Sequence, residues 1–208
     1  MVTLNAKNLT LEQVHQLLKL EEDSDDLSFT ELLALEPLTE FEQQEISQIQ
    51  NDFRYYLNAG KVAEGQVKLL VLAPLLRLAG FYRPPIQILL EQDIAEITIA
   101  DEDTTISGRL DLLAINRHKA PYFWVLVIEA KNSQIDSLAG LPQLLTYAFE
   151  GLKQQESVWA LTTNGVSYRF AYLQSANPSI YQLLPEVNLI DRDRAIQLLQ
   201  VLKAICQI

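Results

Sequence analysis

The residues best suited to chemistry lie at the ends of two apolar segments. The apolar run from Tyr122 to Ala130 carries Glu129 near its end and is followed by Lys131. The apolar segment before it carries Asp111 among leucines. Side chains alternate along a strand, so Glu129 and Lys131 share one side of it. If the two segments pair as a hairpin, Asp111 lies beside Glu129. Two carboxylates and an ammonium so placed predict a site for a hard cation such as Mg²⁺, which prefers oxygen ligands.

The same three residues have a second interpretation. A carboxylate among apolar residues costs free energy unless a cation or hydrogen-bond donors compensate it. Asp111, Glu129 and Lys131 could therefore form a structural ion-pair cluster at the end of a sheet. The sequence by itself leaves this choice open.

The composition fits an ordinary globular protein. Of the 208 residues, 49% are hydrophobic and 21% are charged, and no apolar run is long enough to span a membrane. The N-terminus lacks the basic stretch followed by an apolar run that marks a secretory signal, so we expect a cytoplasmic protein. Cys206 is the only cysteine, which excludes an internal disulfide and a cysteine-based zinc site.

The charge is concentrated at one end of the chain. Residues 1–55 carry 12 acidic and 3 basic side chains, a net charge of −9, whereas residues 56–208 have a net charge of −2. We therefore predict an acidic helical N-terminal extension over 1–55 and a separate domain over 56–208. The total of −11 argues against simple coating of nucleic acid, because phosphate contacts need Lys and Arg.

Periodicity and turn residues predict an α/β sandwich around a mixed sheet. Capping boxes at Thr10–Gln13 and Thr39–Glu42 each begin a helix, and Pro74 is expected to kink a third. The strand-like stretches 86–90 and 94–100 are either separate or one long bent strand. The remaining expected elements are strands 105–115 and 122–130, helix 137–153, a hairpin of 158–162 with 168–173 about Asn164-Gly165, and helix 191–205.

At this point the residues resemble a known family. Asp111 followed by Glu129-Ala130-Lys131 looks like the PD-(D/E)XK signature of restriction-endonuclease-like nucleases, although Leu110 stands where the signature has proline. Gln143-Leu-Leu-Thr-Tyr147 resembles the Q-x-x-x-Y motif of the N-terminal nuclease domain of type I restriction enzyme R subunits. Glu64 resembles the acidic residue of the first core helix of that family. The resemblance covers about residues 55–175.

The resemblance implies a fold and an activity. The fold would be an αβββαβ restriction-endonuclease-like sandwich with added N- and C-terminal helices. The activity would be Mg²⁺-dependent hydrolysis of DNA phosphodiester bonds, with Mn²⁺ as a substitute. No G-x-x-x-x-G-K-[ST] phosphate loop is found, so the ATPase motor of an R subunit is not expected.

The resemblance also implies roles for particular residues. Asp111, Glu129 and the Ala130 carbonyl would hold the metal, and Glu64 would bind it directly or through water. Lys131 would orient the attacking water and stabilise developing negative charge. Gln143 and Tyr147 would position the phosphate backbone or Lys131.

A non-catalytic module is the alternative function. It would keep the nuclease fold and bind nucleic acid or a protein partner, which could be a second copy of the chain. Under this interpretation Glu64 is a carboxylate that favours a helix N-terminus. Gln143 and Tyr147 then belong to an ordinary, partly buried helix face.

Overall fold

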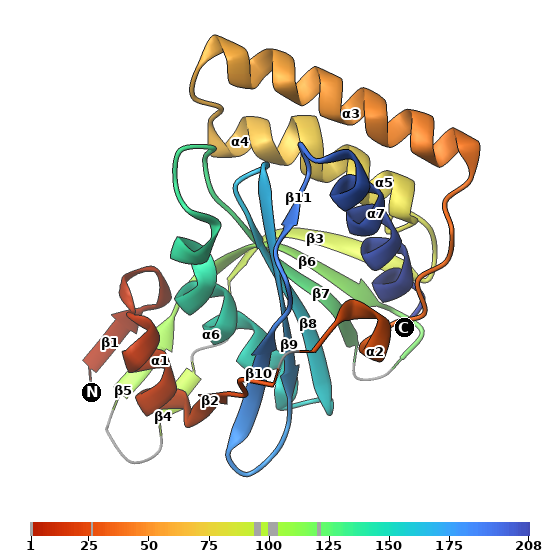
Figure 1. Ribbon diagram of the computed structural model, residues 1–208. Helices are drawn as coiled ribbons and strands as arrows, with labels where there is room; N and C mark the ends of the chain where they lie inside the picture. The colour runs from red at the N-terminus through yellow and green to blue at the C-terminus, as the bar shows by residue number, and fades with distance from the viewer. Residues whose placement is uncertain (1, 26, 94–96, 100–103, 120–121) are drawn as a thin grey trace.

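A computed structural model describes residues 2–25, 27–93, 97–99, 104–119 and 122–208. Within these residues an eight-stranded mixed sheet is covered by helices on both faces, and a three-stranded sheet lies beside it (Figure 1). The mixed α/β architecture expected from the sequence is therefore confirmed. No helix in the described part of the chain is long and apolar enough to cross a membrane.

The large sheet follows the order β2-β10-β9-β8-β7-β6-β3, and β11 pairs with β9. The pairs β3–β6 and β6–β7 are antiparallel, whereas β7 and β8 are parallel. A parallel pair needs a crossover connection, and helix α6 (Leu141–Leu152) supplies it. The strands are β2 (Leu20–Glu22), β3 (Ile86–Asp93), β6 (Arg109–Asn116), β7 (Phe123–Ala130), β8 (Ser157–Thr163), β9 (Ser167–Gln174), β10 (Ser179–Leu183) and β11 (Val187–Asn188).

The small sheet corrects two predictions. It contains β1 (Val2–Asn5), β5 (Thr104–Ser107) and β4 (Ile97–Ile99). Its strand β4 does not continue β3, so the single bent strand considered for 86–100 is wrong; residues 94–96 and 100 lie outside the described part. The strand predicted over 105–115 is likewise two strands, β5 and β6. Gly108 separates them, where a Cβ would lie 2.8 Å from the Tyr147 hydroxyl.

The two helices predicted from capping boxes begin where the sequence predicts. Both capping boxes are present, at Thr10 with Gln13 and at Thr39 with Glu42. The third predicted helix is continuous from α4 to α5, with a π-helical turn, η2, just before Pro74. The helices are η1 (Ala6–Asn8), α1 (Leu11–Leu18), α2 (Phe29–Leu32), α3 (Glu40–Ala59), α4 (Glu64–Val67), η2 (Lys68–Leu72), α5 (Ala73–Ala79), η3 (Ser137–Gly140), α6 (Leu141–Leu152) and α7 (Arg192–Cys206).

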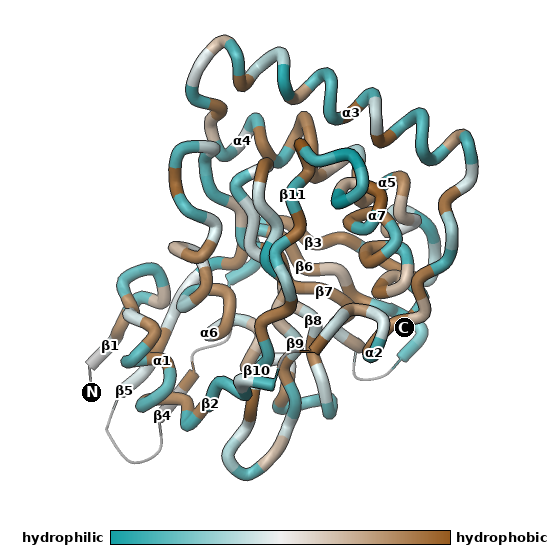
Figure 2. Tube along the Cα trace, viewed as in Figure 1, coloured by the Kyte–Doolittle hydropathy of each residue, from teal (hydrophilic) through white to brown (hydrophobic). Residues whose placement is uncertain are grey.

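Two apolar clusters fill the two sides of the large sheet. One packs α3, α5 and α7 against the sheet, and the other packs α1 and α6 against it, as the brown interior of Figure 2 shows. The buried members of the first run from Phe29 to Ile205, and those of the second from Ala6 to Tyr181. The burial of apolar area in these two layers is the main force that holds the sheet between its helices.

The N-terminal quarter takes part in both clusters. Ile46 and Phe53 are buried in the first, and Val14 and Leu20 are buried in the second. Strands β1 and β2 pair with β5 and β10, and the boundary predicted at residue 55 falls inside α3. Whether residues 1–55 form a separable domain stays a prediction.

Substitution in α3 should distinguish its buried and exposed faces. Phe53→Ala removes a fully buried ring that packs against the turn at Gly165. We expect a loss of about 3–5 kcal/mol in the free energy of unfolding, the usual range for such truncations. The matched control Tyr55→Ala, at a side chain that is 74% exposed, should change it by less than about 0.5 kcal/mol. Urea unfolding compares the two, and equal losses would contradict the integration of α3 into the core.

Candidate active site

Strands β6 and β7 bring two carboxylates to the same end of the large sheet. Their antiparallel pairing sets Leu112 opposite Ile128, which makes Asp111 a neighbour of the last residues of β7. The amide of Ala130 donates a hydrogen bond to Asp111 Oδ2 at 2.8 Å. The hairpin expected from the sequence thus exists, and it fixes Asp111 through the backbone of the neighbouring strand.

Glu129 is the most unusual charged group of this cluster. Its side chain is only 3% exposed, and Lys131 Nζ donates to its Oε1 at 2.7 Å. Its Oε2 is buried without a hydrogen-bond partner among the described residues. The pKa of Glu129 is raised to about 7, because burial and the charge of Asp111 raise it by more than the contact with Lys131 lowers it. A buried, incompletely satisfied carboxylate is costly and needs additional positive charge.

A chain of hydrogen bonds fixes Lys131. Its ammonium donates to Gln143 Oε1 at 3.2 Å, and Gln143 Nε2 donates to the Tyr147 hydroxyl at 2.9 Å. Tyr147 in turn donates to the carbonyl of Arg109 at 3.0 Å, which lies on the same strand as Asp111. Gln143 and Tyr147 are one turn apart on α6, so they share one face of it. The chain therefore ties α6, β7 and β6 together around the ammonium.

The burial of Tyr147 decides which role it can have. Its side chain is fully buried, and burial raises the pKa of its hydroxyl to about 12. The hydroxyl is therefore neutral at physiological pH and has no exposed surface for a phosphate. Of the two roles predicted for the Gln143–Tyr147 pair, the geometry favours positioning of Lys131.

Gly140 allows α6 to begin against the cluster. A Cβ at this position would lie 2.6 Å from Thr162 Oγ1 and 3.2 Å from both Glu129 Cγ and Lys131 Cε. Only the absence of a side chain lets η3 and the start of α6 approach β7 and β8 so closely. Sequence reasoning did not single out Gly140, because its requirement arises from a contact between distant segments.

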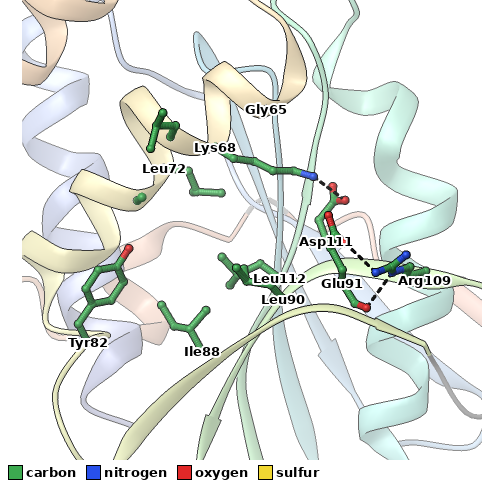
Figure 3. Close-up of a pocket in the computed structure, with 12 residues that line it drawn as sticks. Gly65, Lys68, Leu72, Tyr82, Ile88, Leu90, Glu91, Arg109, Asp111 and Leu112 are labelled. Atoms are coloured by element: carbon green, nitrogen blue, oxygen red, sulfur yellow. Dashed lines mark hydrogen bonds and ion pairs between the residues drawn. The ribbon is translucent and has the colours of Figure 1, made fainter.

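Lys68 is a charged residue that sequence reasoning missed. Its ammonium lies 2.8 Å from Asp111 Oδ1 (Figure 3). It also lies 2.8 Å from Glu64 Oε1. Burial alone would lower the pKa of Lys68, but hydrogen bonds and attraction from Asp111 and Glu64 outweigh it and the pKa is raised. The spacing of Glu64 and Lys68, four residues apart on a helix, is the signal that could have indicated the pair.

The predicted site residues therefore form two linked groups. Glu64 meets Asp111 only through Lys68, whereas Glu129, Lys131, Gln143 and Tyr147 form one hydrogen-bonded chain. In the part of the chain that the structure describes, no three Asp, Glu, His or Cys side chains gather closely enough to hold a metal ion. The three-carboxylate ligand set remains a prediction.

Asp111 and Glu129 nevertheless fit a divalent cation in their chemistry. The unpartnered Glu129 Oε2 is an available oxygen ligand, and a cation there would offset the burial and the repulsion from Asp111 that raise the pKa of Glu129. Asp111 already accepts hydrogen bonds at both oxygens. Lys68 therefore competes with any cation for Asp111.

Strand β7 also departs from the predicted alternation. Regular alternation would put Val125, Val127 and Glu129 on one side of the strand, but the pairing of β6 and β7 shifts register between Ala114 and Ile115. Val125 lies opposite this shift, and it packs in the α3 side of the core instead of the side that Val127 occupies. The irregularity precedes Glu129 and leaves the end of the strand regular.

Comparison with protein-family models finds no match, and comparison with curated proteins finds none either. Among solved structures, one similar chain is described as a fragment of "a putative HsdR subunit of a type I restriction enzyme from Vibrio vulnificus YJ016". The identity is 20% and the TM-score is 0.40 over 67% of this chain. The match spans only 26% of that chain. A likeness of this size establishes neither a shared family nor a shared activity.

The raised pKa of Glu129 predicts a particular pH dependence of stability. The folded state binds this proton more tightly than the unfolded state, whose pKa is near 4.5, so wild type should lose stability as the pH rises from 4.5 to about 7. The expected decrease in the free energy of unfolding is on the order of 3 kcal/mol. Glu129→Gln should lack this loss. Urea unfolding at pH 5 and pH 8 compares the two proteins (about the limits of the transition), and parallel profiles would contradict the assignment.

Proposed function

We propose that this protein is a Mg²⁺-dependent nuclease that hydrolyses DNA phosphodiester bonds and has a restriction-endonuclease-like fold. The order of elements supports the fold: helix 64–79, the antiparallel strands β3, β6 and β7, helix α6, and β8 parallel to β7. In this proposal residues 56–208 form the nuclease-like domain and residues 1–55 the acidic extension. A cytoplasmic location and DNA as partner belong to the same proposal.

One observation carries the proposal. The buried Glu129 has an oxygen without a hydrogen-bond partner among the described residues, its other oxygen accepts from Lys131, and burial and the charge of Asp111 raise its pKa. A purely structural cluster would be expected to satisfy both oxygens of a buried carboxylate. A site that binds a cation needs a carboxylate oxygen that is not already hydrogen-bonded. Perturbed carboxylates of this kind are typical of functional sites.

The residues divide the chemistry among them. Asp111, Glu129 and the Ala130 carbonyl would hold the metal, with Glu64 acting directly or through water. When bound, the metal would polarise the phosphate and supply a water of lowered pKa. Lys131, which contacts Glu129 and Gln143, would place a positive charge where negative charge develops on the phosphate oxygens.

A specific observation also favours the non-catalytic alternative. Lys68 already neutralises Glu64 and Asp111 through two hydrogen bonds of 2.8 Å. If this ammonium is a permanent part of the fold, the cluster needs no metal, and the protein would be a module that binds nucleic acid or a protein partner. The two functions differ in one measurable property, which is whether divalent cations bind to the folded protein.

Replacement of Lys131 tests the catalytic role. We expect Lys131→Ala to reduce DNA cleavage in Mn²⁺ by about 100-fold or more, because the loss of one preorganised stabilising group costs roughly that much. The fold should remain, since Glu129 can take up a proton when its partner is lost. Lys153→Ala is the control, at a half-exposed lysine whose partner is Glu150, and it should cleave like wild type. Cleavage that survives in Lys131→Ala would contradict the role of Lys131.

Metal-dependent thermal melting tests the site without a substrate. A cation at about 100 times its dissociation constant stabilises the fold by roughly 2.7 kcal/mol. Each kcal/mol should raise the melting temperature by roughly 2–4 °C. We expect Mn²⁺ to produce this rise in wild type and not in Asp111→Asn.

Lys68 gives the same experiment a second arm. Lys68→Met should lower the melting temperature without metal, because Glu64 and Asp111 then repel each other, and it should enlarge the rise caused by Mn²⁺. Lys61→Met, at an exposed lysine nearby in the sequence, should match wild type. If Mn²⁺ shifts none of these proteins, the structural ion-pair interpretation replaces the metal site.

A further inference from the structure

A cavity of about 660 Å³ opens directly beside the candidate active site. Lys68 and Asp111 of the site form part of its wall, and Arg109 extends the polar end (Figure 3). Tyr82 lies at the opposite end. The volume is in the range of sites that bind small organic groups. A ligand bound at Asp111 therefore has room to place a neighbouring chemical group in this cavity.

The polar end offers positive charge that a phosphate can use. Arg109 donates to Glu91 Oε2 at 2.7 Å, and both side chains are more than half exposed. Exposed ion pairs contribute little to stability, so a phosphate can compete with Glu91 for this guanidinium. Lys68 lies at the same end. Two cations beside the candidate active site match a phosphodiester on one side of a nucleotide.

The remainder of the cavity is apolar and partly open to solvent. Between its two ends lie Ile88, Leu90 and Leu112, and Leu90 is 61% exposed. Leu69, which is 70% exposed, and Tyr82, which is 51% exposed, complete this surface. Exposed leucines around a half-exposed aromatic ring suit a flat ligand with apolar faces. A nucleobase has such faces and stacks on aromatic side chains.

We propose that this cavity receives an unstacked nucleobase, and that the DNA acted on is therefore single-stranded; this inference rests on the proposed function. Bases in a duplex are paired and stacked and cannot enter a side cavity without being extruded, which costs a few kcal/mol. In a single strand they are free to turn outward. Tyr82 is the stacking residue, and Lys68 with Arg109 contacts the adjoining phosphate.

The charge of the protein favours the same substrate. Duplex binding depends chiefly on many phosphate contacts by Lys and Arg. This chain has a net charge of −11, and the described cations near the site are already paired with carboxylates. Affinity must then come largely from contacts with bases. A single strand offers base faces, whereas a duplex offers mainly its phosphates and groove edges.

Binding and cleavage should be measured separately. Binding is followed by fluorescence anisotropy of a labelled thymidine oligonucleotide and of the matching duplex, with Lys131→Ala in Mn²⁺ to prevent cleavage. The single strand should bind at least about tenfold more tightly. Adding Tyr82→Ala should weaken this binding roughly fivefold to a hundredfold, the equivalent of one base stacked on one ring. Adding Tyr55→Ala, at an exposed tyrosine on α3, should leave it unchanged.

Two further arms locate the base. A single abasic nucleotide, moved along the oligonucleotide, should weaken binding at one or two positions and not elsewhere. Leu90→Ala should weaken binding in the same direction as Tyr82→Ala, and because Leu90 is largely exposed this variant should fold even if the tyrosine variant does not. Thermal melts verify that each variant is folded.

The outcomes separate this inference from the proposed function. If wild type cleaves duplex as well as single strands, and neither Tyr82→Ala nor the abasic positions matter, the cavity assignment is wrong while the nuclease stands. If single strands bind through Tyr82 but no DNA is cleaved, the nuclease is wrong while the cavity assignment stands. Duplex that binds more tightly than the single strand would also overturn the inference.

Discussion

The arrangement of the strands and helices around the end of β7 depends on how one buried carboxylate is compensated. Glu129, the last residue but one of β7, has a side chain that is almost fully buried, and its neighbour Asp111 adds a second negative charge. Lys131 offsets part of that charge, and Gln143 and Tyr147 hold Lys131 in place from α6. Removing a partner from such a buried pair usually costs several kcal/mol. The positions of α6, β6 and β7 are therefore coupled through these charges as well as through the apolar core.

The contacts that compensate the charge of Asp111 attach a further helix to the same end of the sheet. The Ala130 amide donates a hydrogen bond to one oxygen of Asp111. Lys68 donates to the other oxygen and also pairs with Glu64. The helix that begins at Glu64 is thus held against the sheet by a charged contact at one end and by buried leucines, Leu75 and Leu76, further along. The cavity beside Asp111 lies between these two attachments, where η2 faces β3 and β6.

The distribution of charge relates the fold to the proposed activity. Most of the excess negative charge lies in residues 1–55, yet this segment also supplies two strands and core side chains such as Phe53. Its acidity therefore cannot be taken as evidence of a loosely attached tail. At the candidate site each described cation has an acidic partner, so the local field is close to balanced. A phosphodiester substrate would need to exchange with these internal partners, which gives the apolar wall of the cavity a larger share in recognition.

The sequence by itself predicted many of the elements and singled out Glu129, Lys131, Gln143 and Tyr147, the residues that the structure joins by hydrogen bonds. Capping boxes depend on residues three apart, and helical and strand periodicities are local, so α1, α3 and the hairpin around Asn164-Gly165 could be predicted. Only the tertiary structure decided the rest. The separation of β3 from β4, the short strands β1 and β2, and the close approach at Gly140 depend on contacts between distant residues. The contact of Lys68 with Asp111 also depends on the tertiary structure. A local sequence pattern can indicate the pair with Glu64, but not which carboxylate on another element the lysine contacts.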